Sequence, residues 1–283
     1  MSAHLQRISV IIAVRNGAAT LERALTSVFE QTHPDVELIV MDGASTDGTQ
    51  TIVERHAGRI AYWESKADRG VYHAWNKALD HVTGDWICFL GADDRFAAPE
   101  VLKLMGNAVA DAAPSQRVAY GRVHVVDRDG TVILAAGEPW AAVRSTFRTR
   151  MAIPHQATLH RRELFEVHGR FDEGYRICGD YELLLRELVE HEPLFVPGLI
   201  LVEMGSGGLS NRPGSATTMA REFHRARHAH RLERLPEWLS FPVVRVALHG
   251  WIARMLGRRT ADAAVRAYRT VVPRREPPRP DDA

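Results

Sequence analysis

Two adjacent carboxylates, Asp93 and Asp94, directly follow an apolar run and could do chemistry together. Residues 86–90 are mostly β-prone and predict a buried strand, while Gly91 and Ala92 leave space beside its carboxyl end. In open α/β sheets ligands bind outside the carboxyl ends of strands, and Mg²⁺ or Mn²⁺ prefers carboxylate and phosphate oxygens. The pattern is compatible with a metal-bridged phosphate ligand, and equally with a polar turn in which one of the two acids caps the next helix.

A further acid, Asp42, ends another apolar run and is followed by a small polar turn, residues 43–49, that leads into a helix. An acid at this place could accept hydrogen bonds from a base or ribose, and the small loop would let a nucleotide approach the backbone. A dinucleotide-binding fold is disfavoured because the turn at residues 15–20 lacks the G-x-G-x-x-G pattern that binds a pyrophosphate.

Short apolar runs alternate with amphipathic segments in the first part of the chain. The runs predict strands at residues 8–14, 37–41, 60–64 and 86–90. Apolar side chains at helical spacing predict helices at residues 21–29 and 72–82. This βαβ order predicts the α/β class, with a mostly parallel sheet, helices on both faces, and ligand-binding loops.

The pattern changes after Pro114. Shorter β-like pieces are expected at residues 118–120, 123–126 and 132–135, with a hairpin turn at Asp129 and Gly130. We then expect a strand around 156–159, a helix from about Asp180 to Glu190, and a strand at 199–204. After the Gly-rich residues 205–208, helices are predicted at about 216–235, 243–256 and 261–272. The expected division is an α/β domain (1–210), a helical region (211–272) and a Pro-rich disordered tail (273–283).

Composition sets broad limits on function. Of 283 residues, 45% are hydrophobic and 25% are charged, and the net charge of +1 gives no reason to expect nucleic acid as a partner. The two cysteines, Cys88 and Cys178, form neither a disulfide framework nor a zinc pattern, which fits a reducing cytoplasm. The apolar run at 8–14 is too short for a signal peptide or a membrane span.

Residues 241–259 interleave apolar side chains with Arg and His. The pattern is compatible with a basic amphipathic helix that lies on anionic lipid, which would place a cytoplasmic protein at the inner face of the membrane. The alternative is a helix that packs on the first domain and keeps its Arg side chains in solvent.

Four segments, in this order, resemble the family 2 glycosyltransferases of the GT-A fold: residues 8–16, 42–49, 68–78 and 91–94. The resemblance covers about residues 5–210, and residues 68–78 look most like bacterial enzymes that build exopolysaccharide or other surface glycans. It implies an inverting enzyme assisted by Mn²⁺ or Mg²⁺. The implied donor is a UDP, GDP or dTDP sugar, and the implied acceptor is a glycan or a lipid-linked molecule.

The resemblance also implies roles for residues on the donor side. Asp42 would hold the nucleotide base, in a pocket lined by the Ala13 backbone and Arg15. Asp68 and Arg69 would lie near the base, ribose or phosphates, in a loop that Asn76 helps to fix. Asp93 would contact ribose or sugar, and Asp94 would be the metal ligand. Ala92 stands where the family's D-x-D motif has its first acid.

Residues 178–186 resemble the family's E-D motif, but Gly179 replaces the usual Glu, so only Asp180 carries over. In the family this Asp is the general base, which takes the proton of the acceptor hydroxyl as that oxygen attacks the anomeric carbon. Because Asp180 begins a helix, we expect amide donors and the helix dipole to lower its basicity. Without the resemblance, Asp180 reads as a helix N-cap.

His155 and Gln156 resemble the acceptor side of the family, although a lone His is also compatible with a structural role. Residues 207–211 are expected to form a mobile loop near the donor, and the alternative is a simple linker. Two other functions stay open. A sugar nucleotidyltransferase would also combine a parallel sheet with a metal-binding acid, but no Gly-rich, basic triphosphate loop follows the first strand. A non-catalytic nucleotide-sugar or glycan-binding protein is disfavoured because both Asp94 and Asp180 are present.

Overall fold

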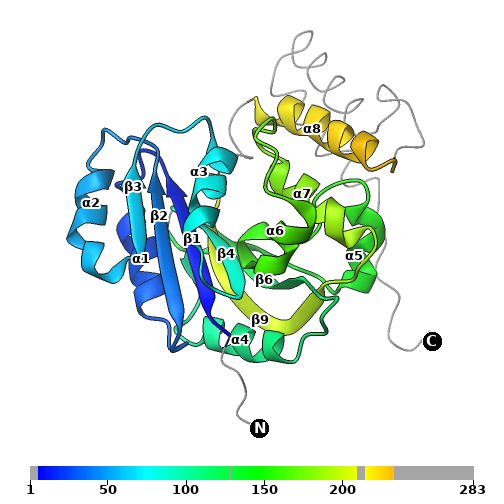
Figure 1. The fold of residues 1–283 in the computed structure, drawn as a ribbon, viewed down its shortest axis with the longest axis horizontal. Coiled ribbons are helices and arrows are strands. Elements are labelled where there is room, and N and C mark those ends of the chain that lie inside the picture. Colours follow the sequence, from blue (N-terminus) through cyan, green and yellow to red (C-terminus); the bar gives the residue numbers. More distant parts are fainter. Residues whose placement is uncertain (1–5, 128, 209–213, 233–283) are drawn as a thin grey trace.

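The computed structural model describes residues 6–127, 129–208 and 214–232 (Figure 1). In these ranges the strands are β1 Ile8–Val14, β2 Val36–Asp42, β3 Tyr62–Ser65, β4 Trp86–Gly91, β5 Arg95–Phe96, β6 Val118–Val126, β7 Val132–Ala136, β8 Thr158–Arg161 and β9 Leu194–Gly205. The α-helices are α1 Leu21–Phe29, α2 Thr49–Arg55, α3 Val71–Ala78, α4 Val101–Ala110, α5 Trp140–Phe147, α6 Arg162–His168, α7 Gly179–Leu188 and α8 Ser215–Ala229. Short 3₁₀ turns are Ala57–Arg59, Leu79–His81 and His155–Ala157.

The described strands form one sheet in the order β3-β2-β1-β4-β8-β6-β9-β5, with β7 paired to β6. The first four strands are parallel, as the βαβ pattern predicts. Their register pairs Val14 with Asp42 and Ala13 with Gly91, so the carboxyl ends of β1, β2 and β4 meet at one edge. Asp42 at the end of β2 and the two acids that follow β4 therefore lie at the same edge, on either side of β1.

The second half of the sheet is mixed. β6 runs parallel to β9 but antiparallel to β7 and β8. The expected break between residues 118–120 and 123–126 was wrong, because both pieces belong to β6. Gly121 lies between them at a register shift, where an added Cβ would come within 2.9 Å of the Leu199 carbonyl oxygen. The predicted hairpin at Asp129 and Gly130 is confirmed by the pairing of β6 with β7.

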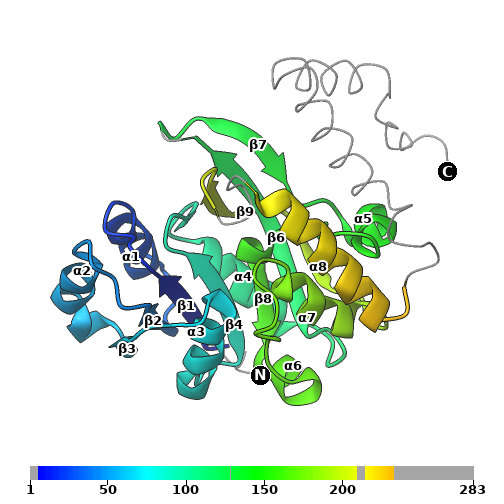
Figure 2. The same ribbon diagram turned by 90° about the horizontal axis from the view of Figure 1, so that it is seen from above.

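Alternation along the strands divides the core between the two faces of the sheet, and Figures 1 and 2 show the helices that flank the sheet. Val10, Ile12 and Val40 pack with the buried faces of α1, α2 and α4. Ile11 and Ile39, which point the other way, pack with α3, α5, α6 and α7. Helices on both faces are confirmed, and the sheet edge between α3 and α7 stays open to a cavity.

Several local predictions need adjustment. The strand expected from Gln156 begins at Thr158, because His155–Ala157 form a 3₁₀ turn. The short helices α5 and α6 were not predicted, since each has about two turns and a weak apolar pattern. The helices expected at 243–256 and 261–272, the basic amphipathic segment 241–259 and the tail 273–283 lie outside the described residues, as does the expected boundary at residue 210. Among the helices described, none is long and apolar enough to span a bilayer.

Candidate functional site

A cavity of about 1220 Å³ lies at the carboxyl ends of β1 and β4. Its walls come from distant segments of the chain: the β1 loop, the start of α3, the end of β4, residues 173–180, the end of β9 and the first turn of α8. The sequence-predicted residues that line it are Ala13, Arg15, Asp68, Arg69, Asp93, Asp94, His155, Gln156 and Asp180. The tertiary structure thus brings Asp94 and Asp180 to the same cavity from different elements.

Asp93 and Asp94 are placed by two glycines. The Asp94 carboxylate folds back over Gly91, where an added Cβ would lie 2.3 Å from its Oδ2 atom, and its Oδ1 accepts a 2.9 Å hydrogen bond from the Gly205 amide. Gly205, at the end of β9, approaches the Asp93 carbonyl so closely that an added Cβ would lie 3.0 Å from it. The two acids are therefore locked between the ends of β4 and β9.

Burial governs the electrostatics of this pair. Asp94 is only 2% exposed, and burial, reinforced by the charge of Asp93, raises its pKa to about 7. Two neighbouring carboxylates in a site of low polarity repel each other, and a divalent cation would relieve that repulsion. Among the described residues no three His, Cys, Asp or Glu side chains form a metal-binding group. The pair suits Mg²⁺ or Mn²⁺ whose remaining ligands are phosphate oxygens and water.

Because Gly91 leaves the space that Asp94 occupies, Gly91→Ala is expected to displace the Asp94 carboxylate. The methyl group would contact Asp94 Oδ2 and Cγ and also Asp93 Oδ1. We expect at least a tenfold loss of apparent Mn²⁺ affinity, since ligand position sets metal affinity. Isothermal titration with Mn²⁺ and a nucleoside diphosphate measures this loss. Gly58→Ala, at a glycine with open space around its Cβ position, is the matched control, and equal affinities in the two variants would contradict the assignment.

Asp180 lies in the first turn of α7 and accepts a 2.8 Å hydrogen bond from the Tyr181 amide. The Tyr72 hydroxyl is 3.3 Å from the same oxygen but 2.6 Å from the Ile177 carbonyl, so its single proton goes to Ile177. Burial raises the pKa of Asp180 to about 6. The expectation of lowered basicity was wrong, because lost hydration outweighs the amide donors.

Tyr72 also explains why a glycine precedes Asp180. The Gly179 amide donates a 2.8 Å hydrogen bond to the Tyr72 hydroxyl, and an added Cβ at Gly179 would lie 2.8 Å from the Tyr72 ring. A residue with a side chain at position 179 therefore conflicts with this aromatic ring. The start of α7 instead packs directly on α3.

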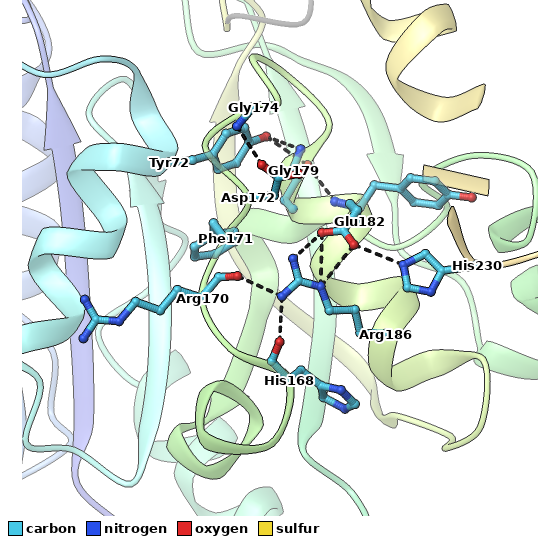
Figure 3. A network of polar contacts seen from close by, with 12 residues as sticks. Tyr72, His168, Arg170, Phe171, Asp172, Gly174, Gly179, Glu182, Arg186 and His230 are labelled. Atoms are coloured by element: carbon cyan, nitrogen blue, oxygen red, sulfur yellow. Dashed lines mark hydrogen bonds and ion pairs between the residues drawn. The ribbon is translucent and has the colours of Figure 1, made fainter. Parts of the chain in front are cut away.

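The interior of α7 anchors the loop that leads to Asp180 (Figure 3). Arg186 bonds the side chain of Glu182 and donates to the carbonyls of His168 and Arg170 at 2.7 and 2.8 Å. Glu182 in turn accepts a bond from His230, just after α8, at 3.1 Å. This network ties α7, α8 and the loop after α6 into one unit.

Two basic side chains contact Asp68 at the cavity wall. Its Oδ1 atom pairs with Lys77 Nζ at 2.8 Å and with His73 Nδ1 at 3.0 Å. Its Oδ2 atom lies 3.4 Å from the Cβ position of Gly43, which lines the cavity. Arg69 pairs with Glu173, so the loop before α3 is joined to the segment that precedes Asp180.

Asp42 and Asn76 do not line the cavity. Asp42 is fully buried, and its carboxylate accepts bonds from the hydroxyls of Ser45 and Ser65, so a nucleotide base could reach it only if these serines move. Asn76 does not bind the loop of Asp68 and Arg69 directly. It bonds the Phe171 backbone and, at 3.2 Å, Glu173, so it supports that loop only through Glu173.

His155 lies at the cavity wall, stacked on Trp75 with ring centroids 5.2 Å apart. It is 5% exposed, and burial lowers its pKa to about 3, so it is a neutral imidazole at physiological pH. A neutral ring adds no charge to attract a diphosphate. Gln156 and the two glycines Gly207 and Gly208 also line the cavity, while residues 209–211 of the expected loop lie outside the described residues.

Sequence reasoning missed two residues that shape the site. Tyr72 and Glu173 both line the cavity, and each contacts a segment about a hundred residues away in the chain. Tyr72 was assigned only to the apolar face of α3, and no motif marked Glu173. Their roles depend on contacts between segments, for which a single sequence carries no local signal.

Comparison with known proteins identifies related chains. The glycosyl transferase family 2 model matches residues 9–166. A PGL/p-HBAD biosynthesis glycosyltransferase of Mycobacterium tuberculosis is 32% identical over 266 residues, which cover 89% of this chain and 94% of the relative. An uncharacterized glycosyltransferase of the same species is 30% identical over 212 residues, covering 74% of this chain and 79% of that protein.

Solved structures share the fold. Staphylococcus aureus TarS 1–349 in complex with UDP-GlcNAc superposes with a TM-score of 0.64 at 17% identity, covering 94% of this chain and 76% of that chain. The mannosyltransferase PcManGT from Pyrobaculum calidifontis, in complex with GDP-Man and Mn²⁺, gives 0.60 at 22% identity, covering 96% and 77%. The α/β architecture is the GT-A fold. Because the family model matches more than half of this chain, the chain belongs to glycosyl transferase family 2 and is a glycosyltransferase.

Proposed function

We propose that this glycosyltransferase transfers a sugar from a nucleoside-diphosphate sugar to a hydroxyl of a glycan or lipid-linked acceptor, with inversion at the anomeric carbon. The observation that carries the proposal is the presence of Asp180 and of the Asp93 and Asp94 pair on one cavity. Asp180, with a pKa of about 6, is suited to act as a base. Asp93 and Asp94 are suited to bind a cation that also binds the diphosphate of the donor.

The donor occupies the side of the cavity built by β1, β4 and the start of α3. Ala13 and Arg15 line this side from the end of β1, and Asp68 and Arg69 line it from the loop before α3. TarS and PcManGT, which share the fold, bind UDP-GlcNAc and GDP-Man, and this supports a nucleotide sugar as donor. Asp42, which precedes Gly43 of the cavity wall, contributes to binding of the nucleotide base once the side chains of Ser45 and Ser65 turn away.

Asp94, with Asp93 beside it, would hold the Mn²⁺ or Mg²⁺. When bound there, the cation supplies positive charge that stabilises the diphosphate as it departs. Arg15 and Arg69 place further positive charge on the cavity wall, and Asp93 contacts the ribose or the sugar. The Gly205 amide keeps Asp94 turned toward the end of β4.

Asp180 acts from the wall formed by α7. It accepts the proton of the acceptor hydroxyl while that oxygen attacks the anomeric carbon from the face opposite the diphosphate, and a single displacement inverts this centre. Its raised pKa keeps it basic enough to take the proton and still ionised at neutral pH. Neutral His155, with Gln156, lines the acceptor side and bonds sugar hydroxyls.

A panel of nucleoside-diphosphate sugars tests the proposal. With 1 mM Mn²⁺, we expect a UDP, GDP or dTDP sugar to raise the melting temperature, because a ligand at about 100 times its Kd stabilises the native state by about 2.7 kcal/mol. Chelation of the metal should reverse the shift. The sugar that binds should then be transferred to an acceptor alcohol, and NMR of the product should show the inverted anomer. A melting temperature unchanged by every sugar, or a retained anomer, would contradict the proposal.

A further inference from the structure

A carboxylate of α8 binds three consecutive backbone amides just before Asp180. The amide of Arg176 donates to Glu222 Oε1 at 2.7 Å, while those of Ile177 and Cys178 donate to Oε2 at 2.9 and 2.8 Å. Glu222 is 8% exposed, so these bonds form away from bulk water. Bonds from amides to a buried carboxylate are stronger and shorter than neutral ones, so they hold the segment firmly.

These amides lie in the segment that leads into α7, which begins at Gly179. Cys178 is the N-cap residue of α7, and its own side chain makes no capping hydrogen bond. Glu222, more than forty residues later in the chain, accepts the amide of Cys178, while Tyr72 accepts the next amide, that of Gly179. The turn that carries Asp180 is therefore held from α8 on one side and from α3 on the other.

Arg225, one turn further along α8, binds the same segment. Its Nη1 donates to the Gly174 carbonyl at 3.0 Å, its Nη2 pairs with Asp172 at 2.6 Å, and its guanidinium lies 4.2 Å from the centroid of the Tyr175 ring. The cavity is lined by Tyr175 and Arg176 of this segment and by the first turn of α8. The helix α8 thus joins the cavity wall to the turn that carries the carboxylate.

We propose that Glu222 is a positioning residue: by binding the amides of residues 176–178 it orients Asp180 toward the acceptor hydroxyl. The inference rests on the proposed function of Asp180 as general base. A reacting group displaced by about 1 Å loses about 10²-fold in rate, so a residue that sets this position has a large effect without touching substrate.

The charge of Glu222 also acts on Asp180. Burial raises the pKa of Asp180 most, the amides of Tyr181 and Asp180 lower it, and the carboxylate of Glu222 raises it further. A neutral residue at position 222 removes the last of these and should lower the pKa of Asp180. Because this change follows from the lost charge alone, the positioning role itself is tested by the loss of kcat at an unchanged donor Kd.

The test compares Glu222→Gln and Glu222→Asp with Arg221→Gln, a substitution at an exposed residue of the same helix. We expect Glu222→Gln to lower kcat for transfer about 10- to 100-fold, while the Kd of the nucleotide sugar with Mn²⁺ stays within twofold of wild type. The acid limb of its pH–rate profile should move to lower pH. Glu222→Asp keeps the charge but is one methylene shorter, so we expect a lower kcat with an unmoved acid limb.

Arg221→Gln should behave as wild type. Circular dichroism and the melting temperature show whether each variant folds, and if Glu222→Gln does not fold, the kcat and donor Kd of Glu222→Asp decide. A kcat within twofold of wild type in the folded variant, a donor Kd weakened as much as kcat is lowered, or an equal loss in Arg221→Gln would overturn the inference. The proposed function itself fails on a different result, which is full activity of Asp180→Asn.

Discussion

Asp180→Asn is expected to lower kcat for sugar transfer by about 10²- to 10⁴-fold, the usual contribution of a general base. The amide keeps the size of the side chain and can still accept the bond from the Tyr181 amide, but it cannot take the acceptor proton. Because the donor side is built by other elements, the Kd of the nucleotide sugar should change less than twofold. Initial rates of transfer and calorimetric titration of the donor measure the two effects.

The pH dependence of proton transfer to Asp180 follows from the direction in which the pKa of Asp180 is shifted. The pKa of Asp180 is raised from 3.8 to about 6, so the carboxylate is ionised and active above pH 6. Below that pH we expect wild-type kcat to fall about tenfold for each pH unit, as the base becomes protonated. Asp111→Asn, at an exposed acid after α4, is the matched control. A wild-type profile that stays flat down to pH 4.5 would show that Asp180 is not the base.

Asp94→Asn is expected to abolish stimulation by Mn²⁺ or Mg²⁺, with a loss of transfer rate of about 10²-fold or more, since metal coordination contributes several kcal/mol to charge stabilisation. Asparagine oxygen is a weaker ligand for a hard cation than carboxylate oxygen. Activity measured against Mn²⁺ concentration tests this expectation, again with Asp111→Asn as control. Equal metal stimulation of both variants would remove Asp94 from the metal site.

Asp94→Asn should also raise the free energy of unfolding of the metal-free protein. The folded state raises the pKa of Asp94 from 3.8 to about 7, so between these values the folded protein binds the proton more tightly than the unfolded chain. The free energy of unfolding therefore decreases as pH rises through this window, by at most about 4 kcal/mol at 1.36 kcal/mol per unit. Asp94→Asn removes this cost and should stabilise the metal-free protein at pH 8 in urea titrations.

The first half of the fold could be predicted because its signals are local. Apolar runs and helical spacing define the parallel strands β1 to β4 and the helices between them, and parallel strands place their carboxyl ends at one edge. Asp93 and Asp94 therefore had to lie beside the β1 loop, and the structure shows both on the cavity. In the second half, the sequence predicted a break at Gly121. The close approach of β9 explains a glycine inside a strand, but this approach leaves no signal in the sequence near residue 121.

The site was predicted less completely than the fold. Motifs indicated Asp94 and Asp180, but the expected sign of the Asp180 shift was wrong, because a pKa depends on how much water the packed neighbours remove. Asp42 lies at the expected strand end, yet its carboxylate is covered by the hydroxyls of Ser45 and Ser65. Nothing along the chain relates Glu222 to residues 176–178.

By itself, the sequence determined which side chains end which strands, since periodicity and the spacing of acids are properties of short segments. Only the tertiary structure decided that Asp180 meets the Asp93 and Asp94 pair on one cavity, that desolvation raises the pKa of Asp180, and that Glu222 holds its turn. The physical reason is that desolvation and long-range hydrogen bonds depend on which distant surfaces exclude water from each other. That information exists only once the segments have packed.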